Sequence, residues 1–272
     1  MITAGVDMGA KTIKVVILSA KGESASGGKD WQIIAKSIIL GGFDQRGAAE
    51  KAFADALNQA KISRNDIDDI TATGLGKKEI YLHPPISANR EVTEVSAAAR
   101  GAVFLFPSVR TVVDVGAEEG RAVKCDSKGK IIDFAVNEKC AAGAGSFTEA
   151  MSRALEVKIE EIGDLSLLST KAVPMNAQCA VFAESEVVSL VHAKTPKADI
   201  ARAVHDAIAS RISSMVKRIG LEKDVALIGG LARNKGFVNS LTQSLGVDKL
   251  LMPDEPEFAG AIGAALISAD NK

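Results

Sequence analysis

Two glycine turns that open with an aspartate are the strongest chemical signal in this 272-residue sequence. They are Asp7-Met8-Gly9 near the N-terminus and Asp114-Val115-Gly116 in the middle of the chain. A glycine turn lets the backbone approach a phosphate because no Cβ intervenes. A carboxylate at its start can hold Mg²⁺, directly or through water, and order an attacking water. One such turn alone is typical of a plain tight hairpin, whereas the pair predicts a polyphosphate site contacted from both sides.

Further residues extend this predicted nucleotide site. Lys11 could place its ammonium on a phosphate oxygen, and Asp7 and Asp114 are the candidate catalytic carboxylates and Mg²⁺ ligands. Gly229-Gly230 follows the apolar run 225–228 at the expected carboxyl end of a strand, where a base or ribose can lie against bare backbone. The candidate nucleotide-binding positions are Gly9, Ala10, Lys11, Thr12, Gly116, Ala117, Gly143, Gly145, Gly229, Gly230 and Asn234.

Two of the three cysteines precede predicted helices. Cys140 leads through a turn of small residues into a helix expected over 146–155, and Cys179 precedes one expected over 183–192. A helix N-terminus stabilises an anion and lowers the pKa of a thiol, so both positions suit thiolate ligands of a metal centre. A closed zinc or [4Fe–4S] site needs four thiolates, so a partner chain would have to supply two. Buried, inert thiols are the alternative for both and the expectation for Cys125.

The elements that must position these residues follow a repeated plan. Residues 6–22 align without a gap onto 113–129, and each copy predicts a β-hairpin followed by a third strand, at 31–40 and 131–136. Chance similarity of two hairpins is the alternative, because periodic strand patterns match easily. We therefore expect two duplicated α/β lobes. The first covers 1–108, with a C-terminal helix 257–272 packed back at the hinge, and the second covers 109–256.

Composition is that of an ordinary globular protein. The 33 Lys and Arg balance 34 Asp and Glu, so the chain lacks the basic face that a nucleic acid requires. We find no signal peptide and no apolar run near the roughly 18 residues that cross a membrane. We therefore expect a cytoplasmic protein that binds neither nucleic acid nor membranes. The scattered His83, His192 and His205 match no catalytic motif and are expected to be surface or packing residues.

Taken together, these motifs resemble the ATP-dependent electron activases, which are the activators of 2-hydroxyacyl-CoA dehydratases and the ATPase subunits of class I benzoyl-CoA reductases. The resemblance rests on both Asp-x-Gly turns and on residues 139–145, 178–186 and 229–234. It implies an actin/Hsp70/sugar-kinase fold with two ribonuclease-H-like lobes around ATP or ADP and Mg²⁺. It also implies a dimer with one [4Fe–4S] cluster at the subunit interface, whose ligands in this chain would be Cys140 and Cys179.

One departure bears on the choice within the family. Homodimeric activators usually have Gly-Gln-Asp after the second Asp-x-Gly, whereas this chain has Ala117-Glu118-Glu119. With the short length, that pattern resembles the smaller ATPase subunit of benzoyl-CoA reductase, which pairs with a larger homologous subunit in anaerobic aromatic degradation. ATP hydrolysis would then drive a low-potential electron from ferredoxin through the shared cluster to the catalytic reductase subunits. Glu118 is the first candidate for orienting the hydrolytic water and Glu119 the second.

Other functions are open at this point. A homodimeric activator of a 2-hydroxyacyl-CoA dehydratase would use the same chemistry on a different client. More distant is an actin-fold small-molecule kinase, which needs a catalytic base for a substrate hydroxyl, and the sequence offers no candidate. A non-catalytic actin-like assembly protein would have no use for the cysteine motifs. The acyl-CoA is not readable from this chain, because it would bind to other subunits.

Overall fold

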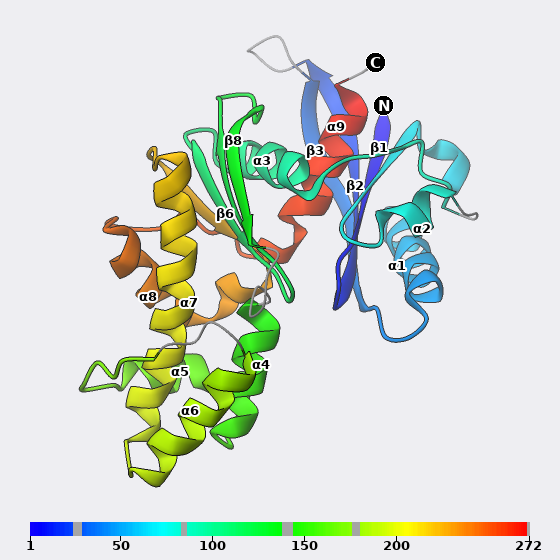
Figure 1. Cartoon of the computed structure of the whole chain (residues 1–272). Coiled ribbons are helices and arrows are strands. Elements are labelled where there is room, and N and C mark those ends of the chain that lie inside the picture. Colours follow the sequence, from blue (N-terminus) through cyan, green and yellow to red (C-terminus); the bar gives the residue numbers. More distant parts are fainter. Residues whose placement is uncertain (24–28, 83–85, 138–143, 176–179, 271–272) are drawn as a thin grey trace. The chain divides into compact units, whose positions relative to one another are not determined.

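A computed structural model of the chain describes residues 1–23, 29–82, 86–137, 144–175 and 180–270 (Figure 1). The chain divides into two compact units. Unit 1 consists of Met1–Pro107, Asp126–Ile131 and Glu257–Lys272, and unit 2 consists of Ser108–Cys125 and Ile132–Pro256. Each unit combines a β-sheet with helices, so the α/β class expected from the sequence is confirmed.

The sheet of unit 1 has five strands in the order β3-β2-β1-β4-β5. The first three form an antiparallel meander, and β4 then lies parallel to β1. The strands are β1 (Ile2–Met8), β2 (Thr12–Glu23), β3 (Lys29–Leu40), β4 (Asp69–Thr73) and β5 (Arg90–Glu91). In the hairpin register, Asp7 of β1 stands opposite Lys14 of β2.

Helices cover both faces of this sheet because alternate residues of β2 point to opposite sides. Ile13 and Val15 pack with α1 (Gln45–Ala60), while Val16 and Leu18 pack with α9 (Ala259–Ala269). The other helices of unit 1 are the short α2 (Lys77–Leu82), α3 (Glu94–Leu105) beside α9, and a 3-10 turn at Arg64–Asp66. The C-terminal helix expected from residue 257 begins instead with a 3-10 turn, Pro256–Phe258.

One turn lies outside the lobe that was predicted to contain it. Residues 126–131 were expected in the second lobe and belong to unit 1. The physical reason is close packing on α3, because a Cβ at Gly129 would lie 2.9 Å from the Cα of Arg100. The φ of Gly129 is +77°, which glycine adopts readily.

Unit 2 repeats the strand plan of unit 1. Its sheet has the order β8-β7-β6-β9, with an antiparallel hairpin at β6 and β7 and β9 parallel to β6. The strands are β6 (Thr111–Val115), β7 (Gly120–Cys125), β8 (Ile131–Asn137) and β9 (Val225–Ile228). The order β8-β7-β6-β9 corresponds strand for strand to β3-β2-β1-β4, so the predicted duplication of two lobes is confirmed.

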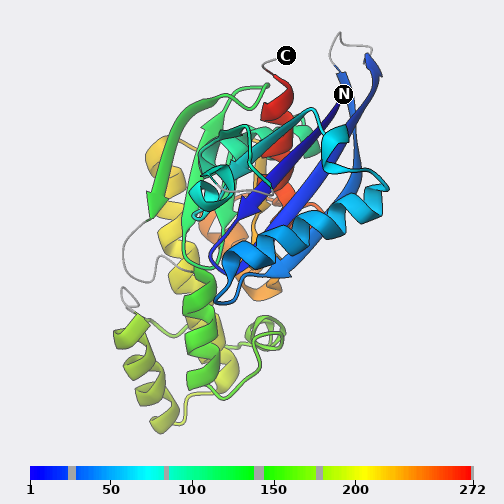
Figure 2. The same cartoon turned by 90° about the vertical axis from the view of Figure 1, so that its right-hand side faces the viewer.

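The helices of unit 2 are organised by the long α7 (Lys197–Ile219), whose apolar residues recur every three or four positions and are buried. Figures 1 and 2 show α4, α5 and α6 gathered around the N-terminal half of α7. These helices are α4 (Ala144–Ala154), α5 (Ile162–Leu167) and α6 (Ala180–His192), and α8 (Lys235–Leu245) packs on α7 as well. Cys125, at the end of β7, is fully buried, as expected for a packing thiol.

Among the described residues, no helix combines the length and the apolar character needed to cross a membrane.

Candidate functional site

Asp7 lies near the carboxyl end of β1 and is paired with a lysine that was not among the predicted site residues. Lys14 Nζ is 3.2 Å from Asp7 Oδ2, and the two side chains are only 12% and 17% exposed. The pair follows from the hairpin register, which sets Asp7 directly opposite Lys14. A Mg²⁺ ion that binds to this carboxylate must therefore compete with an ammonium already in place.

Gly74 completes the site in unit 1. It comes directly after β4, with a φ of +89°. A Cβ there would lie 2.5 Å from the carbonyl oxygen of Met8 and 2.6 Å from Asp7 Oδ1, so only glycine fits. Gly74 was not among the predicted site residues either. The signal that could have identified it is its place at the end of the strand that lies parallel to β1.

Unit 2 carries the matching carboxylate, Asp114, in β6. Arg121 of β7 stands opposite it in the hairpin register, and Arg121 Nη1 is 3.0 Å from Asp114 Oδ2. The second terminal nitrogen of Arg121 donates a hydrogen bond to Glu119 Oε2. Arg121 is thus the structural counterpart of Lys14, with one additional carboxylate bound to it.

A glycine in the left-handed region lies beside this pair too. Gly229 directly follows β9, has a φ of +86°, and would place a Cβ 2.5 Å from Val115 O and 2.7 Å from Asp114 Oδ1. Gly74 has the same surroundings in unit 1. The duplication therefore extends to individual side chains: each unit has a carboxylate, a cation across the hairpin and a glycine against that carboxylate.

The turns themselves refine the predicted phosphate contacts. Gly9 N donates to Thr12 O at 3.1 Å and Gly116 N donates to Glu119 O at 2.9 Å, so both amides close their own turns. A phosphate contact at these glycines would thus rely on the missing side chain rather than on the N–H. The remaining loop residues predicted to meet phosphate are half-buried or exposed: Ala10, Lys11, Thr12 and Ala117.

Helix α4 is fastened to the turn of unit 2. Gly145 N donates to Gly116 O at 3.1 Å, and Ser146 N donates to Ala117 O at 3.0 Å. A Cβ at Gly145 would lie 2.9 Å from the Cα of Ala117, which explains a glycine at this position. Two N-terminal amides of α4 are satisfied in this way. Cys140 and Gly143, which precede α4, lie outside the described residues.

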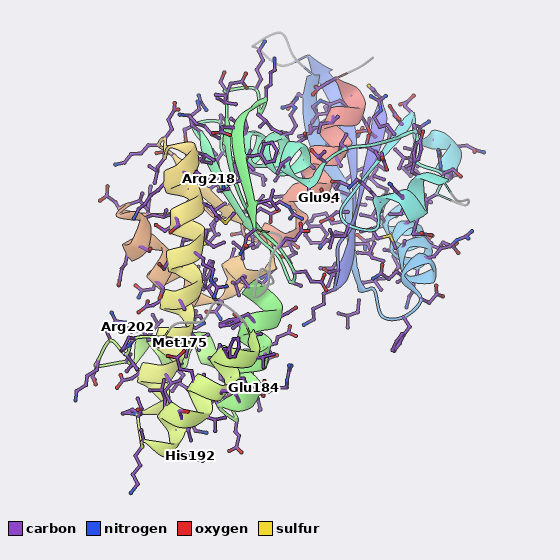
Figure 3. All side chains as sticks on the ribbon, in the orientation of Figure 1. Glu94, Met175, Glu184, His192, Arg202 and Arg218 are labelled. Carbon is purple, nitrogen blue, oxygen red and sulfur yellow. The ribbon has the colours of Figure 1, made fainter. Side chains whose placement is uncertain are left out.

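Helix α6 follows the second cysteine motif. Cys179 also lies outside the described residues, and α6 begins at the next position, Ala180. Helices α4 and α6 pack together and run in the same direction in both views, so their N-terminal ends lie at the same end of the pair (Figures 1 and 2). Figure 3 labels Glu184 in the first half of α6 and His192 at its end. Near its start, Val181 and Phe182 are 69% and 75% exposed.

The glycine pair after β9 has two different roles. Gly229 is required by its close contacts, whereas a Cβ at Gly230 would meet nothing within 4 Å. Gly230 begins the 3-10 turn Gly230–Arg233, which leads into α8. Asn234 caps α8, because its Oδ1 accepts a hydrogen bond from Phe237 N at 3.0 Å. The motif position of Asn234 thus has a structural use within unit 2.

Within the described part of the chain, no group of three or more His, Cys, Asp or Glu side chains could hold a metal ion. The residues present therefore fit Mg²⁺ only as a nucleotide complex, in which phosphate oxygens and water fill most of the coordination sphere.

Comparison with known proteins identifies relatives over nearly the whole chain. The model of the BadF/BadG/BcrA/BcrD ATPase family matches residues 4–268. The chain is 34% identical over 270 residues to the 2-hydroxyisocaproyl-CoA dehydratase activator of Clostridioides difficile, covering 99% of this chain and 96% of the relative. It is 32% identical over 274 aligned positions to a benzoyl-CoA reductase subunit of Thauera aromatica, covering 98% and 93%.

A solved structure is similar over the whole chain. The (R)-2-hydroxyglutaryl-CoA dehydratase component A of Acidaminococcus fermentans superposes with a TM-score of 0.89 at 33% identity, covering 100% of this chain and 98% of that one. The chain therefore has the actin/Hsp70/sugar-kinase fold that the sequence motifs predicted.

Proposed function

Because the chain belongs to the BadF/BadG/BcrA/BcrD ATPase family, we propose that it is an ATP-hydrolysing electron activase that serves a 2-hydroxyacyl-CoA dehydratase. One observation supports the ATPase part above all. A carboxylate–cation pair occurs in each unit, as Asp7–Lys14 and Asp114–Arg121. Each carboxylate lies against a glycine at a position where a Cβ would clash with it. The client is inferred from the relatives, since the dehydratase activator has a higher identity than the reductase subunit.

A subunit of benzoyl-CoA reductase is the second candidate, which the residues Ala117-Glu118-Glu119 favoured at the level of sequence. In the structure Glu119 is bound to Arg121 of the same unit. That ion pair gives the second glutamate of the departure a contact within the turn itself. The departure at the turn therefore does not select the reductase, and the relatives favour the dehydratase.

In the proposed hydrolysis, Asp7 and Asp114 would bind Mg²⁺ directly or accept hydrogen bonds from its water ligands. If Asp7 held Mg²⁺, the ion would supply positive charge to that carboxylate in place of Lys14, and the Lys14 ammonium could then contact a phosphate oxygen. The glycines of both turns admit the phosphates because no Cβ blocks them. An attacking water needs a residue that orients it, and a carboxylate can in addition accept its proton. Glu118 and Glu119 are the candidates.

A cluster shared between two chains is the second part of the proposal. Cys140 and Cys179 would hold a [4Fe–4S] group together with the same two cysteines of a second chain. Each precedes one of the helices α4 and α6, whose N-terminal ends lie at one end of the pair and favour an anionic group. When bound, such a group would supply one-electron redox chemistry. Ferredoxin is the proposed electron donor.

The structure suggests how the two sites influence each other. Hydrogen bonds from Gly145 and Ser146 tie the start of α4 to the turn of unit 2. A change in that turn upon hydrolysis would therefore displace the start of α4, the helix that follows Cys140. The exposed Val181, Phe182 and Val188 on α6 support a contact with another chain there. We propose a homodimer, with the larger homologous subunit as the alternative partner.

Anaerobic purification followed by iron and sulfide analysis tests this proposal. A [4Fe–4S] cluster shared by two copies gives about two iron atoms per chain. Cys140→Ser or Cys179→Ser should abolish iron binding while MgATP still binds, and the buried Cys125→Ala serves as the matched control that keeps iron. A colourless, iron-free protein that phosphorylates a metabolite would contradict the proposal. Iron bound only after co-expression with a larger homologous subunit would favour the reductase.

A further inference from the structure

The turns of the two units differ in charge, because two carboxylates of unit 2 stand where unit 1 has a lysine and a threonine. The alignment of residues 6–22 with 113–129 equates Lys11 with Glu118, Thr12 with Glu119, and Lys14 with Arg121. In unit 1 a single carboxylate, Asp7, meets a single ammonium. In unit 2 two carboxylates share one guanidinium, and a third follows Ala117. The turn of unit 2 therefore brings together three carboxylates that repel one another, whereas the turn of unit 1 has one.

Arg121 neutralises part of this negative charge by pairing with two of the carboxylates. Its side chain is 10% exposed and lies between the side chains of Asp114 and Glu119, which are 16% and 22% exposed. The backbone fixes this arrangement from both ends. Asp114 faces Arg121 across the hairpin, and Gly116 N donates to Glu119 O to close the turn. Glu118, by contrast, is exposed.

We infer that Arg121 is a positioning residue which holds Glu119 back against β7 and leaves Glu118 as the carboxylate that the turn presents to the γ-phosphate. This inference rests on the proposed ATPase function and assigns roles that the sequence left open between Glu118 and Glu119. The guanidinium neutralises Glu119 where a second free carboxylate would repel the nucleotide. It also holds the Asp114 carboxylate in place through the ion pair at 3.0 Å.

The reaction assigned to Glu118 balances as follows. The oxygen of a water forms a bond to the γ-phosphorus, and the bond from that phosphorus to the bridging oxygen breaks, with its electron pair leaving on ADP. The proton of the attacking water passes to the Glu118 carboxylate. Arg121 touches none of these atoms and acts through Glu119 and Asp114.

Arginine suits this position better than lysine does. A guanidinium presents its donors in a rigid fork and can hold two carboxylates at once, whereas an ammonium is a flexible point charge. The contrast between Arg121 with two partners and Lys14 with one follows this chemistry. It predicts that Arg121→Lys keeps only part of the function, even though it keeps the charge.

The test compares ATPase kinetics and MgATP affinity of the full chain with five variants. Glu118→Ala, which removes both the orienting group and the proton acceptor, should lower kcat at least about 100-fold with KM nearly unchanged, whereas Glu119→Gln should lower kcat by less than about tenfold. Arg121→Met frees Glu119 and should raise the Kd for MgATP about tenfold. The double variant Arg121→Met/Glu119→Gln should bring that Kd back toward the wild-type value, because the released carboxylate is gone. Arg121→Lys should fall between wild type and Arg121→Met.

Lys124→Met is the matched control, since Lys124 lies on the same strand and pairs with Glu222 at the surface. It should leave kcat and KM within about twofold of wild type. Rescue by the double variant is the decisive result, because a merely structural role of Arg121 would make two changes worse than one. Equal losses of kcat in Glu118→Ala and Glu119→Gln, or a double variant whose Kd stays raised, would overturn the role inferred for Arg121 and leave the proposed function standing. A wild-type chain that binds no MgATP would overturn the proposed function as well.

Discussion

His205 is a fully buried histidine on α7, and neither of its ring nitrogens has a hydrogen-bond partner among the described residues. Its Nδ1 faces the backbone of α8, because a Cβ at Gly236 would lie 2.6 Å from that atom. Burial lowers the pKa of His205 to about 4, against a smaller opposing effect of Asp206. The folded protein therefore holds this imidazole neutral, and His205 acts as a packing residue.

This burial makes the stability of unit 2 depend on pH. The unfolded chain binds a proton at His205 below its ordinary pKa of 6.5, whereas the folded chain binds one only near pH 4. The contribution of neutral His205 to the free energy of unfolding is thus complete above pH 6.5 and falls as the pH decreases from 6.5 to 4. Below pH 4 it changes no further. Between pH 7 and pH 5 we expect it to lower the free energy of unfolding by about 2 kcal/mol.

Urea unfolding at pH 7 and pH 5 measures the effect. The variant His205→Asn removes the titrating ring and should lose about 2 kcal/mol less than wild type between the two pH values. His192→Asn is the control, because His192 is exposed at the end of α6. That control should retain the pH dependence of wild type. An unchanged pH dependence in His205→Asn would show that another group titrates.

At the scale of elements, α9 packs so closely against α3 that only glycine fits at their contact. A Cβ at Gly263 would overlap the carbonyl oxygen of Ala97 and lie 2.8 Å from Gly101 N. Gly263→Ala should therefore destabilise unit 1 by about 1–3 kcal/mol, although alanine is the better helix former. Thermal unfolding measures this, with Gly260→Ala as the matched control.

The control lies in the same helix but has room. A Cβ at Gly260 would be 3.4 Å from Asp7 Oδ2, an ordinary contact. Gly260→Ala should keep the stability within about 1 kcal/mol of wild type or raise it, as alanine does in a helix. If both variants lost the same stability, close packing against α3 would not be the reason for Gly263.

The elements that were predictable are those whose signal is local. Both hairpins follow from an Asp-x-Gly turn between β-branched runs, and α7 follows from apolar residues at helical spacing. Helices α2 and α5 were missed because each has only 6 residues, too few for a period to show. The assignment of residues 126–131 to unit 1 depends on contact with α3, for which no local pattern exists.

The site was predictable to a similar degree. Asp7, Asp114 and Gly229 have a motif, and the structure sets each beside a cation or against a carboxylate. Lys14 and Arg121 have no motif of their own. Their roles follow only from the strand register, which pairs each with its aspartate across the hairpin. Counting back from the turn would have identified both, since the turn fixes which residues of a hairpin stand opposite each other.

At the scale of the whole molecule, the duplication raises the question whether the two units bind one MgATP together or one each. Each unit has its own sheet, core and carboxylate–cation pair. The proposed function requires that one MgATP uses both pairs, so a ligand bound at one turn should protect the other turn too. Hydrogen exchange of backbone amides reports each turn separately, because local opening sets its rate.

We expect MgATP to slow exchange at least about tenfold in peptides that cover residues 8–12 and in peptides that cover 116–120. Asp7→Asn, which changes only unit 1, should remove this protection from both turns, and Asp114→Asn should do the same, since the proposed function assigns both carboxylates to one bound MgATP. Asp133→Asn is the control, because Asp133 is exposed on β8 and should leave both protections intact. If Asp7→Asn removed protection from residues 8–12 alone, each unit would bind its own ligand, and the duplicated turns would be two sites rather than two halves of one.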